Sequence, residues 1–98
     1  MLDVEAIAGW FAGASKPMRL AIAETHLFGS VLEPHISPFD VDVVIVFQDW
    51  DVRGWCTELK RSFQLAFGRP LHIQMFHISQ ANELDEFLER AARTRRIM

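Results

Sequence analysis

Cysteine and long apolar runs are scarce in this chain, and their absence narrows its class. Cys56 is the only cysteine among 98 residues, so neither an intrachain disulfide nor a cysteine-based zinc cluster can form. No apolar run is long enough to cross a bilayer, and Asp3 and Glu5 stand where a signal peptide needs positive charge. We therefore expect a cytoplasmic protein without a membrane partner.

An excess of charge of one sign is also missing. The formal net charge of −3 gives no overall attraction to a polynucleotide, which disfavours a nucleic acid partner. Tyrosine is absent, but half the residues are apolar and include eight Phe and three Trp, which excludes disorder. The length predicts a single domain over residues 1–98, and the apolar richness favours a subunit interface, as in a homo-oligomer.

The most informative feature present is a Gly-Ser pair followed, after nine residues, by an Asp-x-Asp triplet. Gly29 and Ser30 end an apolar stretch, where a glycine lets backbone N–H groups approach a phosphate and a serine hydroxyl can join them. Asp40 and Asp42 open the most strand-like run of the sequence. Residues two apart on a strand share a face, so the two carboxylates should project together, as a Mg²⁺ site requires.

These residues carry a family resemblance. The residues from Leu27 to Ser30, followed by those from Asp40 to Ile45, resemble the signature of the DNA polymerase beta-like nucleotidyltransferase superfamily in its minimal, single-domain bacterial form. The resemblance covers residues 25–77. It implies that the Gly-Ser pair holds the phosphates of a nucleoside triphosphate and that the two aspartates bind the catalytic Mg²⁺ or Mn²⁺.

The chain also departs from the family pattern. Members usually carry an Arg-Gly pair soon after the Gly-Ser and a serine before the first aspartate, where this chain has Glu33-Pro34 and Phe39. Active members place a third carboxylate on a later strand, but residues 70–77 contain none. His72 most resembles the replacement, with Gln74 on the same face as the alternative. A neutral imidazole can accept a hydroxyl proton as a general base, but it is a poor Mg²⁺ ligand.

Each of these residues also has an ordinary structural explanation. Gly29 and Ser30 can form a strand-ending turn, and Asp40 and Asp42 can be a solvated strand start. A histidine that alternates with apolar residues, as His72 does, is commonly a hydrogen-bonded surface residue. The C-terminal arginines fit either a solvated helix end or a contact with phosphate or RNA. They are Arg90, Arg93, Arg95 and Arg96.

The expected fold is α+β, a small mixed sheet of about three strands covered by helices in the order α-β-β-α-β-α. The β-branched run over residues 41–47 predicts a central strand buried on both faces. The other predicted elements are a helix near the N-terminus, a strand over residues 18–28, a helix from Asp49 or Asp51 to Phe67 ended by Gly68, a strand over residues 71–78 and a helix capped by Ser79 or Asn82.

Two hypotheses of function follow. The first is a metal-dependent nucleotidyltransferase that passes a nucleoside monophosphate from a triphosphate to a hydroxyl of a protein or small molecule. Minimal members often pair with a small helical protein and act as its antitoxin, so the resemblance implies such a partner. The alternative is a catalytically weakened fold that serves as a nucleotide-binding or protein-interaction module. A carboxylate reaching the site from Glu24 or Glu33 would favour the enzyme.

Overall fold

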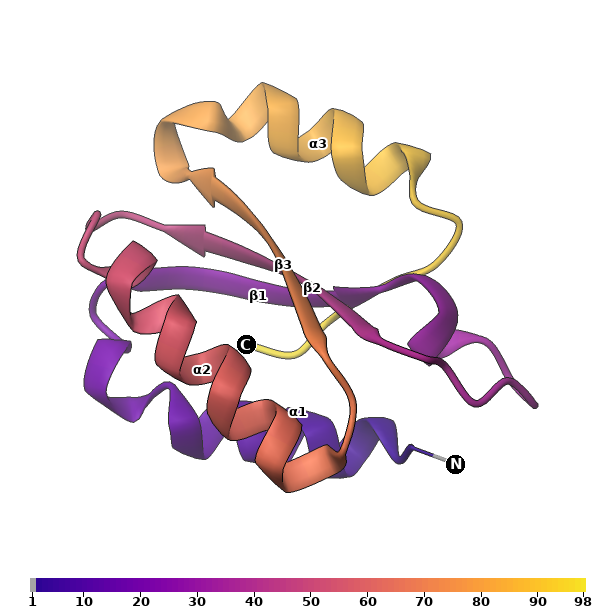
Figure 1. Cartoon of the computed structure of the whole chain (residues 1–98). Coiled ribbons are helices and arrows are strands. Elements are labelled where there is room, and N and C mark those ends of the chain that lie inside the picture. Colours follow the sequence, from indigo (N-terminus) through magenta and orange to yellow (C-terminus); the bar gives the residue numbers. More distant parts are fainter. Residues whose placement is uncertain (1) are drawn as a thin grey trace.

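Four strands form one sheet, in the order β3-β2-β1-β4, and helices cover both of its faces (Figure 1). This computed structural model describes residues 2–98. The elements are α1 (Val4–Ala14), β1 (Ile22–Phe28), β2 (Val41–Phe47), α2 (Val52–Phe67), β3 (Leu71–His77), α3 (Ala81–Arg90) and β4 (Thr94–Arg96), with 3-10 turns η1 (Lys16–Met18), η2 (Gly29–Leu32) and η3 (Ile78–Gln80). The predicted α+β class and element order are confirmed, with β4 as an additional strand.

β2 is the central strand. It pairs antiparallel with β1 and parallel with β3, so both of its edges are hydrogen-bonded. Val41, Val43, Ile45 and Phe47 lie in the main core, whereas Val44 and Val46 lie in a second cluster on the opposite face. Burial of alternate residues on both faces confirms the prediction from the continuous β-branched run.

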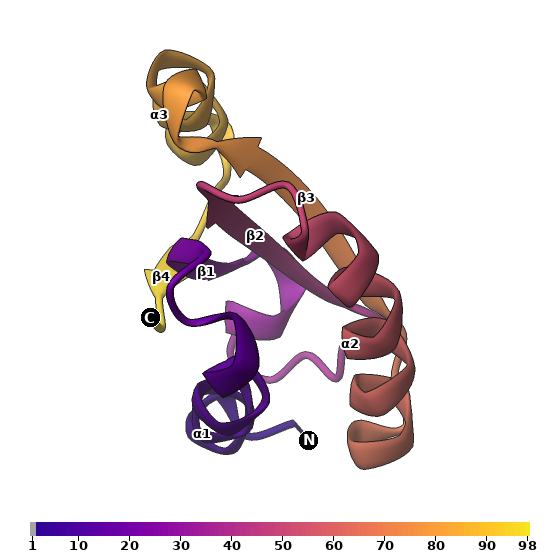
Figure 2. The same cartoon turned by 90° about the vertical axis from the view of Figure 1, so that its left-hand side faces the viewer.

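Helices α1 and α2 lie on one side of the sheet and α3 on the other (Figure 2). Phe11 of α1 and Phe63 of α2 are completely buried, and the Trp10 ring packs edge-on against Phe63 at 5.3 Å between centroids. α2 ends at Phe67, and its C-cap Gly68 has a left-handed φ of 68°, which favours glycine. The buried residues of α2 lie at helical spacing, and the helix ends where the sequence predicts; they are Val52, Cys56, Leu59 and Phe63.

Helix α3 covers the other face of the sheet. Its Leu84 is buried with Val44 and Val46, and Phe76 and Phe87 pack against this cluster. The predicted caps are wrong, because the helix begins at Ala81 after η3 and its N-cap Gln80 makes no side-chain capping bond. Instead, the His77 side chain accepts a hydrogen bond from the Ser79 N–H at 3.1 Å.

β1 begins at Ile22, four residues later than predicted. Pro17 lies inside η1, where the Met18 N–H donates to the Ser15 carbonyl and the Ala21 N–H to the Met18 carbonyl. These local bonds hold the chain in turns up to Ala21, because proline favours a tight turn and cannot donate to a strand ladder.

β4 is a short strand that pairs antiparallel with β1. Around it, three arginines of the C-terminal cluster form ion pairs with glutamates from earlier in the chain. These pairs are Arg93 with Glu33 at 3.1 Å, Arg96 with Glu24 at 3.2 Å, and Arg95 with Glu5. The explanation as a solvated helix end is therefore wrong beyond Arg90, because the chain leaves the helix and joins the sheet.

None of the helices within residues 2–98 is both long enough and apolar enough to cross a bilayer.

Candidate metal and phosphate site

The register of the sheet brings together the three residues predicted to act in catalysis. Asp42 of β2 lies opposite Phe28 of β1 and is in register with His72 of the parallel strand β3. Asp40 precedes Asp42 by two residues and so shares its face of the strand. Asp40, Asp42 and His72 each offer one ligand atom, and these three atoms lie within 4.8 Å of one another. We call these three residues the acidic cluster.

His72 contacts both carboxylates of this cluster. Its Nδ1 lies 3.0 Å from Asp40 Oδ2 and 3.7 Å from Asp42 Oδ1, and 63% of its side chain is exposed. A hydrogen on Nδ1 can therefore be donated to Asp40, which leaves the Nε2 lone pair as a proton acceptor. Gln74, the weaker alternative, is in register with Val44 and lies farther along the sheet.

Gly29 brings the backbone of the turn after β1 next to the acidic cluster. Its φ is 78°, and a Cβ placed on it would lie 3.1 Å from Asp42 Oδ2. Its own N–H donates to the Arg93 carbonyl at 3.2 Å. Gly29 thus makes room for Asp42, while its N–H is bonded to the chain just before β4.

Ser30 follows in the η2 turn and is partly buried. Its carbonyl accepts a hydrogen bond from the Glu33 N–H at 3.1 Å, which fixes the turn. The turn therefore starts at the residue that abuts Asp42, so the Gly-Ser pair and the two aspartates are adjacent in space, as the motif predicts.

The electrostatics of the cluster favour an added cation. Burial is the main cause that raises the pKa of Asp42 above its ordinary 3.8, and the neighbouring charge of Asp40 raises it further. The nearby His72 acts in the opposite direction and lowers this pKa. Two carboxylates that repel one another and are partly removed from water suit a hard divalent cation. The cation's charge compensates both the repulsion and the loss of hydration. Asp40 and Asp42 are thus suited to hold such an ion, with His72 beside them.

A third carboxylate does not reach the cluster from the two positions considered in the sequence. Glu24 lies 3.4 Å from His26 Nε2 and is also paired with Arg96, and Glu33 is paired with Arg93. Among the described residues, the metal-binding group therefore contains two carboxylates and one imidazole. This composition differs from the three carboxylates that the family resemblance implies for an active site.

The loop before Asp40 exposes apolar side chains. Phe39 is 84% exposed and Ile36 is 46% exposed, in a segment that also contains His35 at a φ of 69°. In the sequence, Phe39 is distinguished only as the residue that stands where the family pattern has a serine. The signal that could have identified this surface is the placement of two large apolar residues in a polar, proline-containing loop directly before a carboxylate pair.

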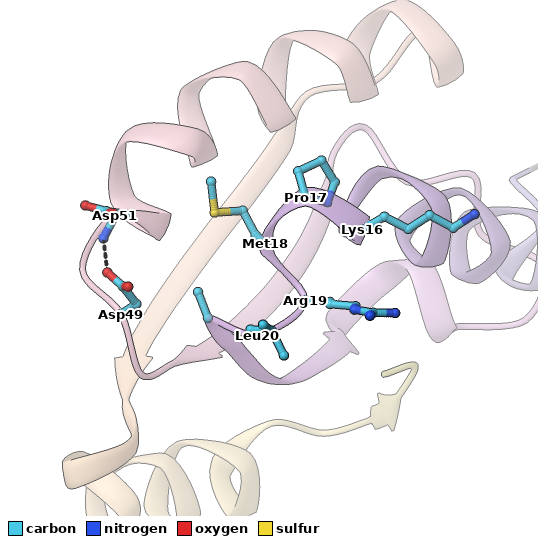
Figure 3. Close-up of a pocket in the computed structure, with 8 residues that line it drawn as sticks. Lys16, Pro17, Met18, Arg19, Leu20, Asp49 and Asp51 are labelled. Carbon is cyan, nitrogen blue, oxygen red and sulfur yellow. Dashed lines mark hydrogen bonds between the residues drawn. The ribbon is translucent and has the colours of Figure 1, made fainter.

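A separate cavity of about 380 Å³ lies at the opposite end of the sheet, where β2 ends and β1 begins. Its lining includes two basic residues, Lys16 and Arg19, and two acidic ones, Asp49 and Asp51. The basic side chains extend away from the carboxylates, and the Asp51 N–H donates to Asp49 Oδ1 at 3.0 Å (Figure 3). The charged groups do not converge there, in contrast to the acidic cluster.

Comparison with known proteins supports the fold. No protein-family model matches the chain, and no curated protein does. Among solved structures, a chain of the crystal structure of the toxin–antitoxin MntA-HpeT, in a mutant in which two aspartates two positions apart are replaced by glutamate, is similar. The TM-score is 0.61 and the identity 12%, over 93% of this chain and 72% of that chain. The small α+β fold of this protein is therefore nucleotidyltransferase-like.

Proposed function

We propose that this protein is a metal-dependent nucleotidyltransferase that moves a nucleoside monophosphate from a nucleoside triphosphate to a hydroxyl group. The observation that carries the proposal is the convergence of Asp40 and Asp42 beside Gly29, on a nucleotidyltransferase-like fold. A Gly-Ser pair alone or an Asp-x-Asp alone is common, but their meeting at one point of a sheet meets the needs of phosphate and metal together.

Asp40 and Asp42 hold Mg²⁺ or Mn²⁺ in this proposal. An ion held there would place positive charge beside the triphosphate and would stabilise the negative charge that develops on it during transfer. The Ser30 hydroxyl binds a phosphate oxygen, and the left-handed turn at Gly29 lets the phosphate come close to the backbone. Positioning and electrostatics account for most of the rate enhancement in this chemistry.

His72 is the proposed general base. With Nδ1–H directed at Asp40, Nε2 accepts the proton of the acceptor hydroxyl. The hydroxyl oxygen then forms a bond to the α-phosphorus, the bond from this phosphorus to the bridging oxygen breaks, and pyrophosphate leaves with the bonding electrons. The high exposure of the imidazole suits an acceptor that arrives from outside the protein.

A protein is the acceptor that we favour. The similar solved chain comes from a toxin–antitoxin complex, so that fold is found beside a partner protein. In this chain the exposed Phe39 and Ile36 lie directly before Asp40, where an apolar partner surface would contact them next to the reacting groups. We propose that this loop helps to dock the partner.

The composition of the cluster supports a second candidate, a catalytically weakened module that binds a nucleotide or a protein. Its specific support is that Asp40 and Asp42 are the only carboxylates in the metal-binding group of the described residues. Such a module would bind the metal and the triphosphate but would not transfer the nucleotide. Both candidates predict that Asp42→Asn loses nucleotide binding. Only the enzyme predicts that His72→Ala loses nucleotide transfer while it still binds the nucleotide.

The test is thermal unfolding of the native chain with each nucleoside triphosphate, with and without Mg²⁺. Saturation at ~100 times the dissociation constant adds about 2.7 kcal/mol, a rise on the order of 10 °C for a domain of this size. We expect the rise to need Mg²⁺ and to vanish in Asp42→Asn. Asp85→Asn, an exposed carboxylate on α3, is the matched control and should keep it. A rise that is equal without Mg²⁺ or in Asp42→Asn contradicts the proposal.

A further inference from the structure

A recess lies between the end of β1 and the last turn of α3. It has a volume of about 400 Å³ and is lined by Phe28, Phe87, Arg90 and Ala91. The rings of Phe28 and Phe87 meet edge-on, with 5.0 Å between their centroids, so the two aromatic walls hold one another in place. Both rings belong to the cluster around Val44, Val46 and Leu84, which anchors them to the sheet.

This recess adjoins the acidic cluster on the same face of the sheet. Phe28 directly precedes Gly29 and lies opposite Asp42 in the β1–β2 ladder. Side chains that face one another across an antiparallel pair have Cβ atoms about 5 Å apart. A molecule whose phosphates lie at Asp42 and Gly29 can therefore place the group at the other end of its phosphate chain in the recess.

The lining suits a flat aromatic ring. Arg90 has no ion-pair partner among residues 2–98, although Arg93, Arg95 and Arg96 are all paired with glutamates. A free guanidinium stacks on an aromatic face and hydrogen-bonds at its edge. Two phenyl rings and the Ala91 methyl group supply apolar contact around it, in a volume that matches a small-ligand pocket.

We infer that this recess binds the nucleobase of the nucleoside triphosphate, with the phosphates at Gly29 and the acidic cluster. The inference rests on the proposed function. Because no lining side chain is a carboxylate, amide or hydroxyl, the recess recognises a base by stacking and by the donors of Arg90. Purines stack over a larger area than pyrimidines, so the recess prefers purines and separates adenine from guanine weakly.

The test compares binding of Mg²⁺–ATP, Mg²⁺–CTP and Mg²⁺–tripolyphosphate, measured by calorimetry on the full chain. Ala91→Phe fills the recess, and the extended backbone at this position accepts a larger residue. Ala81→Phe is the matched control at the other, exposed end of α3. We expect native protein to bind ATP at least about tenfold more tightly than tripolyphosphate. Ala91→Phe should remove this difference and leave tripolyphosphate affinity unchanged, while Ala81→Phe should bind as native.

Arg90→Gln is a second variant that does not depend on filling the recess. Arg90 is exposed, so its replacement should leave the fold intact and weaken ATP binding several-fold more than tripolyphosphate binding. The inference is overturned if native protein binds ATP and tripolyphosphate with equal affinity, or if ATP affinity is unchanged in both variants. In either case, phosphate binding that depends on Asp42 still supports the proposed function. Failure of every probe to bind overturns the inference and the proposed function together.

Discussion

At the scale of single residues, Gly29 links the backbone to the acidic cluster. Its left-handed φ favours glycine, and the position that a Cβ would occupy is 3.1 Å from Asp42 Oδ2. The two constraints are independent, since the left-handed φ affects the energy of the turn, whereas the short distance affects the position of the Asp42 carboxylate. A side chain at this position should therefore affect stability and metal binding separately.

We predict that Gly29→Ala lowers the free energy of unfolding by about 1–2 kcal/mol, because an L-residue is strained at this φ. It should also weaken Mg²⁺-dependent triphosphate binding beyond what the lost stability explains, because Asp42 must shift. Urea unfolding and calorimetry measure the two effects. Gly54→Ala is the matched control, since Gly54 lies inside α2 and a Cβ added there would contact no side chain or other element within 4 Å; alanine should stabilise the helix by up to about 1 kcal/mol.

Asp42 shows how a binding residue can reduce stability. Its pKa is raised by burial and by Asp40, so the folded chain holds this proton to a higher pH than the unfolded chain does. The native state therefore binds more protons just above pH 3.8, and stability falls as pH rises through that window. Without a bound cation, ionisation of Asp42 is less favourable in the fold than in the unfolded chain.

We predict that Asp42→Asn, free of metal, unfolds at pH 7 with a free energy equal to or greater than that of the native chain. The advantage should disappear at pH 3, where Asp42 is protonated in both states. Chemical denaturation across this range measures it, with Asp85→Asn as the control for an exposed carboxylate. A loss of stability well beyond about 0.5 kcal/mol at pH 7 would show that Asp42 supports the fold, against its proposed role.

At the scale of elements, β2 and β4 differ in how clearly the sequence indicates them. The β-branched run of β2 is apolar on both faces, and a strand buries both faces when it lies in the middle of a sheet that is covered on both sides. The central position of β2 therefore follows from its residues. β4 is three exposed residues, Thr94–Arg96, with no apolar alternation. Its pairing depends on backbone bonds to β1 and on glutamates that are distant in the sequence, so it could not be predicted.

We predict that Ile97→Pro releases β4. The Ile97 N–H donates to the Thr25 carbonyl at 2.8 Å, and proline removes this donor, at a cost of roughly 1–2 kcal/mol. The Gly29 amide, which is bonded to the Arg93 carbonyl, should then exchange its hydrogen faster, while amides of β2 stay protected. Hydrogen exchange by NMR measures this. Ile97→Val keeps the donor and should behave as native; an unchanged Gly29 amide in Ile97→Pro would contradict the prediction.

At the scale of the whole molecule, most of the C-terminal arginine cluster is paired with glutamates from earlier in the chain. The net charge is −3, and three of the four C-terminal arginines are paired with Glu5, Glu24 and Glu33. Ion pairs of this exposed kind contribute little to stability. They set a carboxylate beside each of these three arginines, so the basic cluster of the sequence is interspersed with negative charge around β4.

We predict that the protein does not bind single-stranded RNA detectably at about 150 mM salt, where non-specific binders reach dissociation constants of roughly 10⁻⁴ to 10⁻⁶ M. Fluorescence anisotropy with a labelled RNA measures the affinity. The triple variant Glu5→Gln, Glu24→Gln, Glu33→Gln frees the arginines and should bind with a clear dependence on salt. Tight, salt-dependent binding by the native chain would contradict the prediction.

The sequence by itself determined the central strand, the amphipathic helix α2 and the pairing of a Gly-Ser turn with two aspartates. The strand and the helix depend on local periodicity, so the pattern is sufficient for them, whereas the pairing was implied by the resemblance of residues 27–30 and 40–45 to a family signature. Tertiary structure alone decided that His72 contacts both aspartates, that the Gly29 N–H is bonded to Arg93, and that Phe28 and Phe87 enclose a recess beside Asp42. The physical reason is that each of these contacts joins separate elements, and their register and packing appear only when the whole sheet is assembled.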